Sequence, residues 1–243
     1  MEPKEYELMY QEEERYWWFV VKRFFIKTLL KKLKLKKEQK ILDIGCGTGK
    51  NLEILSSFGK VWGIDISPLA LNFCQKRGFK NLKRASVEKT PFKNRAFGLI
   101  TLFDVLYHKG IKDDRLALKE IYRVLEKGGY LLLTDCAYNF LFGPHDIAVH
   151  ARQRYTRGEL NKKIKKTGFK ILKSSYIFFF PFLFFVIDRL LSKFFIPKKR
   201  STFIEIPKLA NQIFILMGKL ESWLLQFLNF PFGSSIIILA KKE

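Results

Sequence analysis

The chain has 243 residues, of which 48% are hydrophobic, so it can bury a substantial core and is not a disordered polypeptide. Its formal net charge of +22 is extreme for an enzyme of small molecules and indicates an anionic partner: nucleic acid, an acidic membrane surface or an anionic substrate. The cysteines show no close metal-ligand spacing and are predicted to be buried, reduced thiols of a cytoplasmic protein: Cys46, Cys74 and Cys136. The charged residues 1–11 do not have the pattern of a secretory signal peptide.

Residues 6–37 follow a helical pattern, with an acidic start, an aromatic cluster at 16–19 and then apolar residues interleaved with lysine. A helix of this kind has an aromatic face and a basic face, and it either covers the sheet of a larger domain or contacts a membrane. Both interpretations stay open, and residues 1–40 are assigned to an N-terminal helical cover.

Residues 41–50 combine a short apolar run with three alternating glycines, at positions 45, 47 and 49. This pattern predicts a buried strand that ends in a tight turn, since glycine takes positive φ without cost and leaves room for a close ligand. A turn from a strand into a helix also presents free N–H groups. The dinucleotide fingerprint needs Gly-x-Gly-x-x-Gly, but here the third glycine comes one residue early and Lys50 holds its place. The spacing therefore favours a nucleoside ligand other than NAD.

A second apolar stretch, residues 61–67, contains Asp65, twenty-two residues after Asp43. An acidic residue at the end of the second strand of a βαβ unit can accept hydrogen bonds from both ribose hydroxyls. The run Asp-x-Gly-x-Gly-x-Gly, followed by this acid, resembles motif I of the class I S-adenosylmethionine (SAM) dependent methyltransferases. The resemblance is to the type 11/12 subgroup, and it extends to Trp-Trp-Phe at 17–19 with Arg23, Asp-x-Leu-x-His at 104–108 and Arg-Val-Leu-x-x-Gly-Gly at 123–129.

The resemblance implies an α/β fold: a Rossmann-like, seven-stranded, doubly wound sheet that binds S-adenosyl-L-methionine. Helices are expected over residues 51–58, 68–77, 115–125 and 156–167, and further strands over 81–87, 97–103, 130–134, 169–178 and 234–241. Ser67 before Pro68 is a predicted helix N-cap, and Thr156 with Glu159 is a predicted capping box.

The cofactor is expected beyond the carboxyl ends of the strands, where ligands bind in open parallel sheets. Ser86 stands where the family has an aspartate that meets the adenine amino group, so adenine recognition would depend partly on the Val87 backbone. Phe103, Asp104 and His108 are expected to face the methionine half of the cofactor and the substrate. The predicted cofactor-binding residues are Asp43, Gly45, Cys46, Gly47, Gly49, Asp65, Ile66, Ser86, Val87 and Phe103.

All three histidines of the chain follow the fourth and fifth predicted strands. A histidine there could take a proton from an acceptor hydroxyl or amine, so His108 and His145 are the predicted catalytic bases, with loop orientation by hydrogen bonds as the alternative. The spacing of His145, Asp146 and His150 matches no metal signature, and no metal site is predicted. The predicted substrate-binding residues are Tyr107, His150, Arg152, Arg154 and Tyr155, of which the arginines could clamp a phosphate or carboxylate or belong to a solvated basic loop.

More than fifty residues separate the sixth and seventh predicted strands, where the family has a short hairpin. The apolar run at 177–187 is about half of the roughly 20 residues needed to span a bilayer, and Pro181 and Asp188 weaken a spanning helix further. The composition predicts helices that lie in the membrane interface, the second of them at 208–230. The residues expected to meet anionic headgroups are Lys193, Lys198, Lys199 and Arg200. The alternatives are a helical subdomain that covers its own apolar face and a dimer interface.

Three parts are therefore predicted: the cover at 1–40, a SAM-binding domain at 41–175 with 233–243, and a hydrophobic, membrane-associated insertion at 176–232. The predicted function is SAM-dependent methyl transfer to a small or amphiphilic, including lipid-linked, acceptor by a cytoplasmic protein peripheral to the membrane. RNA-binding surfaces interleave aromatics with polar residues, whereas here whole blocks are apolar, so an RNA-directed methyltransferase is the alternative. A SAM-binding module without turnover is the other alternative. The acceptor atom and the oligomeric state stay open.

Overall fold

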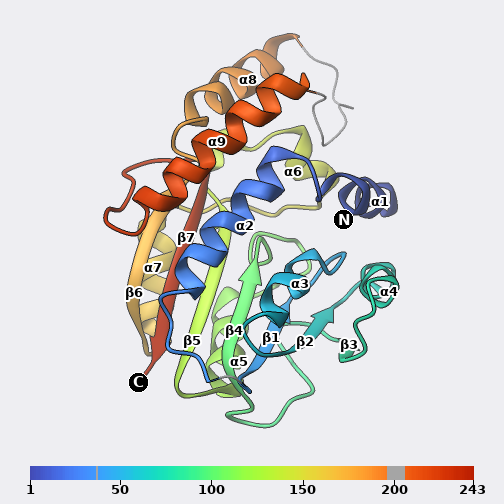
Figure 1. Cartoon of the computed structure of the whole chain (residues 1–243), viewed down its shortest axis with the longest axis vertical. Helices are drawn as coiled ribbons and strands as arrows, with labels where there is room; N and C mark the ends of the chain where they lie inside the picture. Colours follow the sequence, from blue (N-terminus) through green and yellow to red (C-terminus); the bar gives the residue numbers. More distant parts are fainter. Residues whose placement is uncertain (37, 196–205) are drawn as a thin grey trace.

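The computed structural model describes residues 1–36, 38–195 and 206–243, and its centre is a seven-stranded sheet (Figure 1). The strand order is β3-β2-β1-β4-β5-β7-β6. Strand β7 runs antiparallel to both of its neighbours, while the remaining pairs are parallel. The strands are β1 (Lys40–Ile44), β2 (Lys60–Asp65), β3 (Leu82–Arg84), β4 (Phe97–Phe103), β5 (Leu125–Cys136), β6 (Phe169–Ile177) and β7 (Ser235–Lys242). The order doubles back at β1 and β4, so the predicted doubly wound sheet is confirmed.

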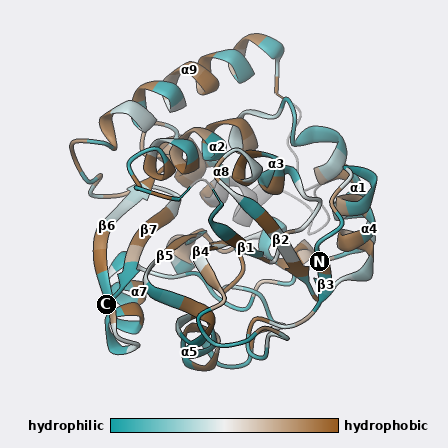
Figure 2. Ribbon diagram, turned by 60° about the horizontal axis from the view of Figure 1, so that its bottom comes forward, coloured by the Kyte–Doolittle hydropathy of each residue, from teal (hydrophilic) through white to brown (hydrophobic). Residues whose placement is uncertain are grey.

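Helices cover both faces of this sheet, with α2 and α3 on one face and α5 and α7 on the other (Figures 1 and 2). The helices are α1 (Pro3–Glu12), α2 (Trp17–Leu30), α3 (Lys50–Ser56), α4 (Pro68–Lys76), α5 (Asp114–Val124), α6 (Pro144–Ala148), α7 (Arg157–Lys166), α8 (Phe182–Phe195) and α9 (Lys208–Leu224). Strand β4 is buried along its whole length because both of its faces are covered, which explains its uninterrupted apolar sequence. Residues 236–239 of β7 are buried for the same reason.

The predicted helix starts are confirmed. The Ser67 hydroxyl accepts a hydrogen bond from the backbone N–H of Ala70, and Thr156 and Glu159 form the capping box of α7. Two strand predictions need correction. Strand β3 stops at Arg84, because residues 85–87 turn toward the ligand end of the sheet, and β5 is much longer than residues 130–134.

The N-terminal cover is two helices rather than the single helix predicted over 6–37. Helix α1 ends at Glu12, and the Glu13 carboxylate then turns inward to accept hydrogen bonds from Thr48 and Arg77. Helix α2 then starts at Trp17, whose backbone N–H donates to Asn211 Oδ1 at 2.9 Å. The local sequence did not predict this interruption of the helix, because the residues that stabilise it, Thr48, Arg77 and Asn211, are distant in sequence.

The long connection between β6 and β7 contains helices α8 and α9, which lie together at one end of the molecule (Figure 1). Its start needs a small correction, since β6 pairs with β7 as far as Ile177, whereas the predicted insertion begins at 176. No helix among the described residues combines the length and apolar character needed to cross a membrane. Lys198, Lys199 and Arg200 lie outside the described residues, as does the side chain of Lys193.

Helix α9 packs along α2 through small and polar residues. A Cβ atom on Gly218 would come within 2.3 Å of Val21 Cγ2, so the two backbones approach closely at this glycine. Thr28 and Ser222 share a hydrogen bond of 2.7 Å between their hydroxyls. The buried Glu221 carboxylate accepts hydrogen bonds from the backbone N–H groups of residues 179 and 180. The insertion is thus joined to the N-terminal cover.

Candidate active site

A cavity of about 490 Å³ opens at the carboxyl ends of the parallel strands, within the range of small-molecule sites. Its floor comes from the segments after β1, β2, β4 and β5, and its walls from α1, α2 and α8. The walls include Tyr6 and Met9 of α1, Trp17 and Trp18 of α2, and Phe185 of α8. The N-terminal cover and the insertion therefore both contribute to the same cavity as the glycine turn.

The glycine turn has the backbone conformation that its sequence predicts. Gly45, Gly47 and Gly49 all have positive φ, between +54° and +88°. A Cβ atom on Gly45 would lie 2.4 Å from Val105 Cγ2, so this position has no room for a side chain. Gly45 and Gly47 line the cavity, but Gly49 packs against Cys74 and does not line it. The third glycine thus serves helix packing rather than direct ligand contact.

Asp65 presents its carboxylate at the end of β2, in the cavity wall. Its two oxygens accept hydrogen bonds from the backbone N–H groups of Gly47, at 3.1 Å, and Ser67, at 2.9 Å. These bonds tie the carboxylate to the glycine turn and fix its direction, while each oxygen keeps further acceptor capacity. Burial raises the pKa of this carboxyl above its ordinary value, although the backbone donors oppose the shift.

Asp43 lies beneath the turn and does not line the cavity. Its Oδ1 accepts a hydrogen bond of 2.6 Å from the Thr101 hydroxyl, and its Oδ2 has no hydrogen-bond partner within the described part of the chain. Complete burial raises the pKa of this carboxyl to about 7. Asp43 therefore supports the turn from below. It is not placed to contact the cofactor directly, contrary to the prediction.

The cavity residues fit a nucleoside cofactor. Asp65 has acceptor capacity for ribose hydroxyls, and the turn lacks side chains where a ligand would approach. Ile66, Ser86 and Val87 line the adjoining wall, where an adenine ring would stand. The Ser86 hydroxyl accepts a hydrogen bond from the Glu88 N–H at 3.2 Å, so it stabilises a local turn. Cys46 and Phe103 line the cavity as predicted.

The structure brings the three histidines to one cavity. His108 follows β4, and burial lowers its pKa to about 4, so its imidazole is neutral near pH 7. Its ring lies 4.3 Å from that of Tyr107, another predicted substrate residue that lines the cavity. His145 stands in α6, and His150 is exposed at the rim with a φ of +56°. Their catalytic and binding roles remain predictions.

The arginine predictions need correction. Arg154 reaches the cavity wall, but its guanidinium is buried in an ion pair with Asp146, at 2.8 and 3.0 Å, and also donates to the Ala137 carbonyl. Arg154 therefore stabilises the loop after β5, and these contacts occupy the guanidinium that was predicted to bind substrate. Because Asp146 is taken by this pair and by the Gly143 N–H, it is not available as a metal ligand.

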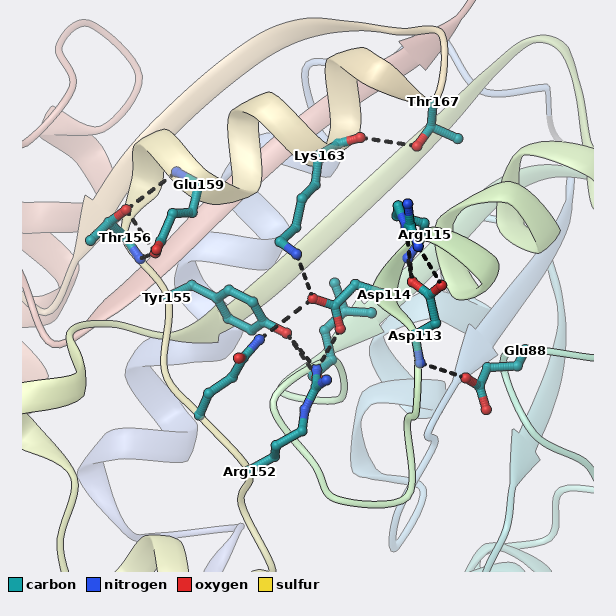
Figure 3. Close-up of polar contacts among 12 residues, drawn as sticks. Glu88, Asp113, Asp114, Arg115, Arg152, Tyr155, Thr156, Glu159, Lys163 and Thr167 are labelled. Atoms are coloured by element: carbon teal, nitrogen blue, oxygen red, sulfur yellow. Dashed lines mark hydrogen bonds and ion pairs between the residues drawn. The ribbon is translucent and has the colours of Figure 1, made fainter.

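Arg152 and Tyr155 do not line the cavity, contrary to their predicted contact with substrate. Figure 3 shows Arg152 and Lys163 converging on Asp114, at 2.5 and 2.9 Å. The Tyr155 hydroxyl donates to the Leu106 carbonyl and accepts from Arg152. These residues join α5 and α7 behind the sheet and fix the segment that leads to His108.

Sequence reasoning missed two groups of cavity residues. Lys22 of α2 forms a buried ion pair with Asp104, and its ammonium lies 3.4 Å from the centroid of the Trp18 ring. The spacing of Trp18 and Lys22, one helical turn apart, was the available signal. Glu13 was the other omission, since its contact with Arg77 depends on tertiary structure.

The sheet order, the glycine turn and Asp65 define a class I SAM-dependent methyltransferase domain, and SAM is the cofactor of this class. Residues 42–133 match the family model described as a methyltransferase domain, so the matched part of the chain is a domain of this family.

The chain is similar to several relatives, and it shares its fold with solved structures. The uncharacterized protein MJ1252 of Methanocaldococcus jannaschii is 38% identical over 39% of this chain and 36% of its own length. The ubiquinone/menaquinone biosynthesis C-methyltransferase UbiE of Neisseria gonorrhoeae is 35% identical over 46% of this chain and 49% of its own length. The chain thus spans only about a third to a half of these relatives. A chain described as a putative methyltransferase, solved in complex with the Haloferax volcanii Trm112 methyltransferase activator, shares the fold with a TM-score of 0.63 at 15% identity, over 98% of this chain and 93% of its own.

Proposed function

We propose that this chain transfers the methyl group of SAM to a small or amphiphilic acceptor, including a lipid-linked one, at a membrane surface. The observation that carries the proposal is the shared cavity, because α8 contributes both to the cavity wall and to an exposed apolar surface. The predicted division into a cover, a SAM-binding domain and an insertion is kept in this proposal, with the insertion starting after Ile177.

The chain would hold the two reactants rather than react covalently. When bound, SAM supplies an electrophilic methyl group on a sulfonium centre. Asp65, the glycine turn and Val87 would hold the nucleoside half, and Phe103 would stand beside the reacting end. Holding two reactants in line supplies much of the rate acceleration in such a displacement.

The acceptor side of the cavity is aromatic. Trp17 and Trp18 line it from α2, and Phe185 lines it from α8. Trp17 also packs against the rings of Phe178 and Phe214, so this wall is held in place by the insertion. Such a wall suits an apolar or planar acceptor. The name of the UbiE relatives, which places them in ubiquinone/menaquinone biosynthesis, agrees with an amphiphilic acceptor.

The outer sides of α8 and α9 form an exposed apolar surface, called here the outer apolar surface. On α9 the exposed residues recur every three or four positions, on the side opposite Gly218 and Glu221. Exposed apolar side chains clustered on neighbouring helices mark an interaction site. The surface consists of Leu183, Phe184, Ile187, Leu190, Leu209, Ile213, Leu216, Leu220, Trp223, Phe227 and Leu228.

Lysines border the outer apolar surface. The Lys32 ammonium lies 5.8 Å from the Phe227 ring, and that of Lys173 donates to the Leu228 carbonyl at 2.8 Å. Lys219 projects from α9 toward Phe24. Apolar side chains bordered by cations are the arrangement that binds an anionic bilayer in the plane of its interface.

Vesicle sedimentation tests the membrane part of the proposal. The wild-type protein should sediment with phosphatidylglycerol-containing vesicles more strongly than with phosphatidylcholine alone. Leu216→Glu combined with Leu220→Glu should abolish sedimentation, because both side chains are more than half exposed on α9. Leu116→Glu is the matched control, since Leu116 is 53% exposed on α5. Unchanged sedimentation of the double variant would refute membrane binding by the outer apolar surface. If the wild-type protein is a dimer on gel filtration and the double variant is a monomer, the surface is instead a dimer interface.

Methyl transfer is tested with SAM labelled in its methyl group and cell extract separated into lipid, RNA and protein fractions. Label in the lipid fraction is the expected result. Label in RNA would favour the RNA-directed alternative. Binding of S-adenosylhomocysteine without transfer to any fraction would favour a SAM-binding module.

A further inference from the structure

Glu5 of helix α1 is a buried carboxylate in the wall of the cavity. The residue is only 7% exposed, and it lines the cavity. Its Oε2 is enclosed and has no hydrogen-bond partner among the residues that the structure describes. Burying a charged group without a partner is costly. A carboxylate of this kind in a ligand cavity therefore indicates that the ligand supplies the missing hydrogen-bond donor.

Helix α1 does not use the Glu5 side chain as a cap. Glu5 stands three residues after the N-cap residue Glu2, where a glutamate commonly closes a capping box by accepting from the N-cap N–H. Here the Glu2 N–H donates to the Ala148 carbonyl instead, at 3.3 Å. Glu5 therefore keeps its acceptor capacity for a group that enters the cavity.

The packing of α1 fixes the side of the helix that meets the cavity. Glu5, Tyr6 and Met9 line the cavity from α1, and their spacing places them on one side of the helix. Elsewhere on α1, the Tyr10 ring stacks on that of Phe73 of α4, with 4.7 Å between the ring centroids. This contact holds α1 against the domain, so the position of Glu5 in the cavity wall is defined.

The neighbours of Glu5 on this side of α1 lie at the part of the cavity assigned to the ribose. Burial and the nearby charge of Asp65 raise the pKa of Tyr6 to about 12, so Tyr6 lies close to that carboxylate. The Met9 methyl group would lie 3.2 Å from a Cβ atom on Gly47. Asp65 and Gly47 are themselves joined by the hydrogen bond of 3.1 Å. Glu5 therefore belongs to the wall beside the predicted ribose site.

We propose that the Glu5 carboxylate accepts a hydrogen bond from a ribose hydroxyl of SAM, as a second acceptor beside Asp65. The inference rests on the proposed binding of SAM and does not depend on the identity of the methyl acceptor. A ribose carries two hydroxyl donors, and each oxygen of Asp65 already accepts one backbone N–H. Because Glu5 belongs to α1, the nucleoside itself would draw the N-terminal cover closed over the cofactor.

Binding measurements with Glu5→Gln test this contact. Glu7→Gln is the matched control, since Glu7 is exposed on the same helix. Calorimetry should show S-adenosylhomocysteine binding about 10-fold more weakly to Glu5→Gln, and unchanged binding to Glu7→Gln. The same loss is expected with 5′-methylthioadenosine, which keeps the ribose but lacks the amino acid. The loss should shrink for the 2′-deoxy or the 3′-deoxy form of S-adenosylhomocysteine, because the hydroxyl that Glu5 holds is then missing.

Thermal unfolding distinguishes a binding role from a structural one. The free Glu5→Gln protein should melt at the same temperature as wild type or higher, because the substitution removes an unpaired buried charge. S-adenosylhomocysteine should raise the melting temperature less in Glu5→Gln than in wild type. A free variant that melts lower and loses the same affinity for every ligand would show that Glu5 only stabilises the start of α1.

The set of ligands decides between the possible outcomes. Unchanged S-adenosylhomocysteine affinity in Glu5→Gln would overturn this inference alone. So would a loss that is absent with 5′-methylthioadenosine, which would assign Glu5 to the amino acid end of the cofactor, or a full loss that persists with both deoxy forms. Failure of the wild-type protein to bind S-adenosylhomocysteine would overturn the proposed function and this inference with it.

Discussion

Asp65 is the residue on which the cofactor assignment depends most directly. Its carboxylate lines the cavity and is oriented by the Gly47 and Ser67 N–H groups. Asp65→Asn should weaken S-adenosylhomocysteine binding about 10- to 100-fold, the usual cost of losing a hydrogen bond to a charged group. Calorimetry measures this change. Ser86→Ala should change the affinity little, since that hydroxyl serves the Glu88 N–H. An equal loss in both variants would argue against the special role of Asp65.

Glu221 makes the stability of the fold depend on pH. Burial raises its pKa to about 7, so the folded protein binds its proton more tightly than the unfolded chain does. The resulting stabilisation is complete at acidic pH and is lost as the pH rises through about 7. Glu221→Gln lacks this contribution. Relative to wild type, its free energy of unfolding should therefore improve by about 2 to 3 kcal/mol between about pH 5 and about pH 8.

Urea unfolding of both proteins at the two pH values measures this difference. Glu120→Gln is the opposite control, because Arg123 and Thr90 hold the pKa of Glu120 at about 2. Its contribution should be present throughout the neutral range and be lost only in acid. A constant difference between wild type and Glu221→Gln would contradict the raised pKa.

Individual elements were predicted from sequence wherever their signals are local. The glycine turn, the caps of α4 and α7 and the apolar β4 all follow from adjacent residues, and the structure has them in place. The break between α1 and α2 was not predicted, because Trp17 is capped by Asn211, 194 positions away in sequence. The same reason hid the Lys22–Asp104 pair. Arg152 and Tyr155 were misplaced because chain proximity to a site does not give the direction of a side chain.

The close contact of α9 with α2 gives a prediction at this scale. Gly218→Ala should destabilise the protein by about 1 to 3 kcal/mol, because the added methyl group would overlap Val21 and well-packed sites tolerate extra volume poorly. Gly158→Ala on α7 is the matched control, since a Cβ atom there meets nothing within 4 Å, and alanine favours a helix. Urea unfolding should separate the two variants. A stable Gly218→Ala protein would show that α9 can shift away from α2.

At the scale of the whole molecule, the cofactor cavity is closed by segments from both ends of the sequence. Residues of α1, α2 and α8 all line it, so a ligand that fills the cavity would contact the N-terminal cover. The cover is tied to the glycine turn through Glu13, which contacts both Thr48 and Arg77. Arg77 also pairs with Glu53 and donates to the Thr48 carbonyl.

Arg77→Met should therefore loosen the cover. S-adenosylhomocysteine should dissociate about 10-fold faster, and proteolysis within residues 12–16 should increase, because the buried Glu13 loses its cation. Stopped-flow fluorescence and limited digestion with a glutamate-specific protease, which can cleave after Glu12, Glu13 or Glu14 in both variants, measure the two effects. Arg15→Met is the control, since the Arg15 side chain is 74% exposed and pairs only with Glu12 among the ion pairs of the described residues. Equal dissociation rates in the two variants would mean that the cover does not retain the ligand.

The position of β7 between β5 and β6 has a consequence for synthesis on the ribosome. Strand β6 hydrogen-bonds to β7 and not to β5, and both apolar helices of the insertion are translated before β7. Until β7 emerges, the nascent chain exposes the edge of β5, the unpaired β6 and the apolar sides of α8 and α9 together. Such edges and surfaces favour aggregation and chaperone binding. Strand β7, which is translated after all of these elements, therefore converts an aggregation-prone intermediate into the complete seven-stranded sheet.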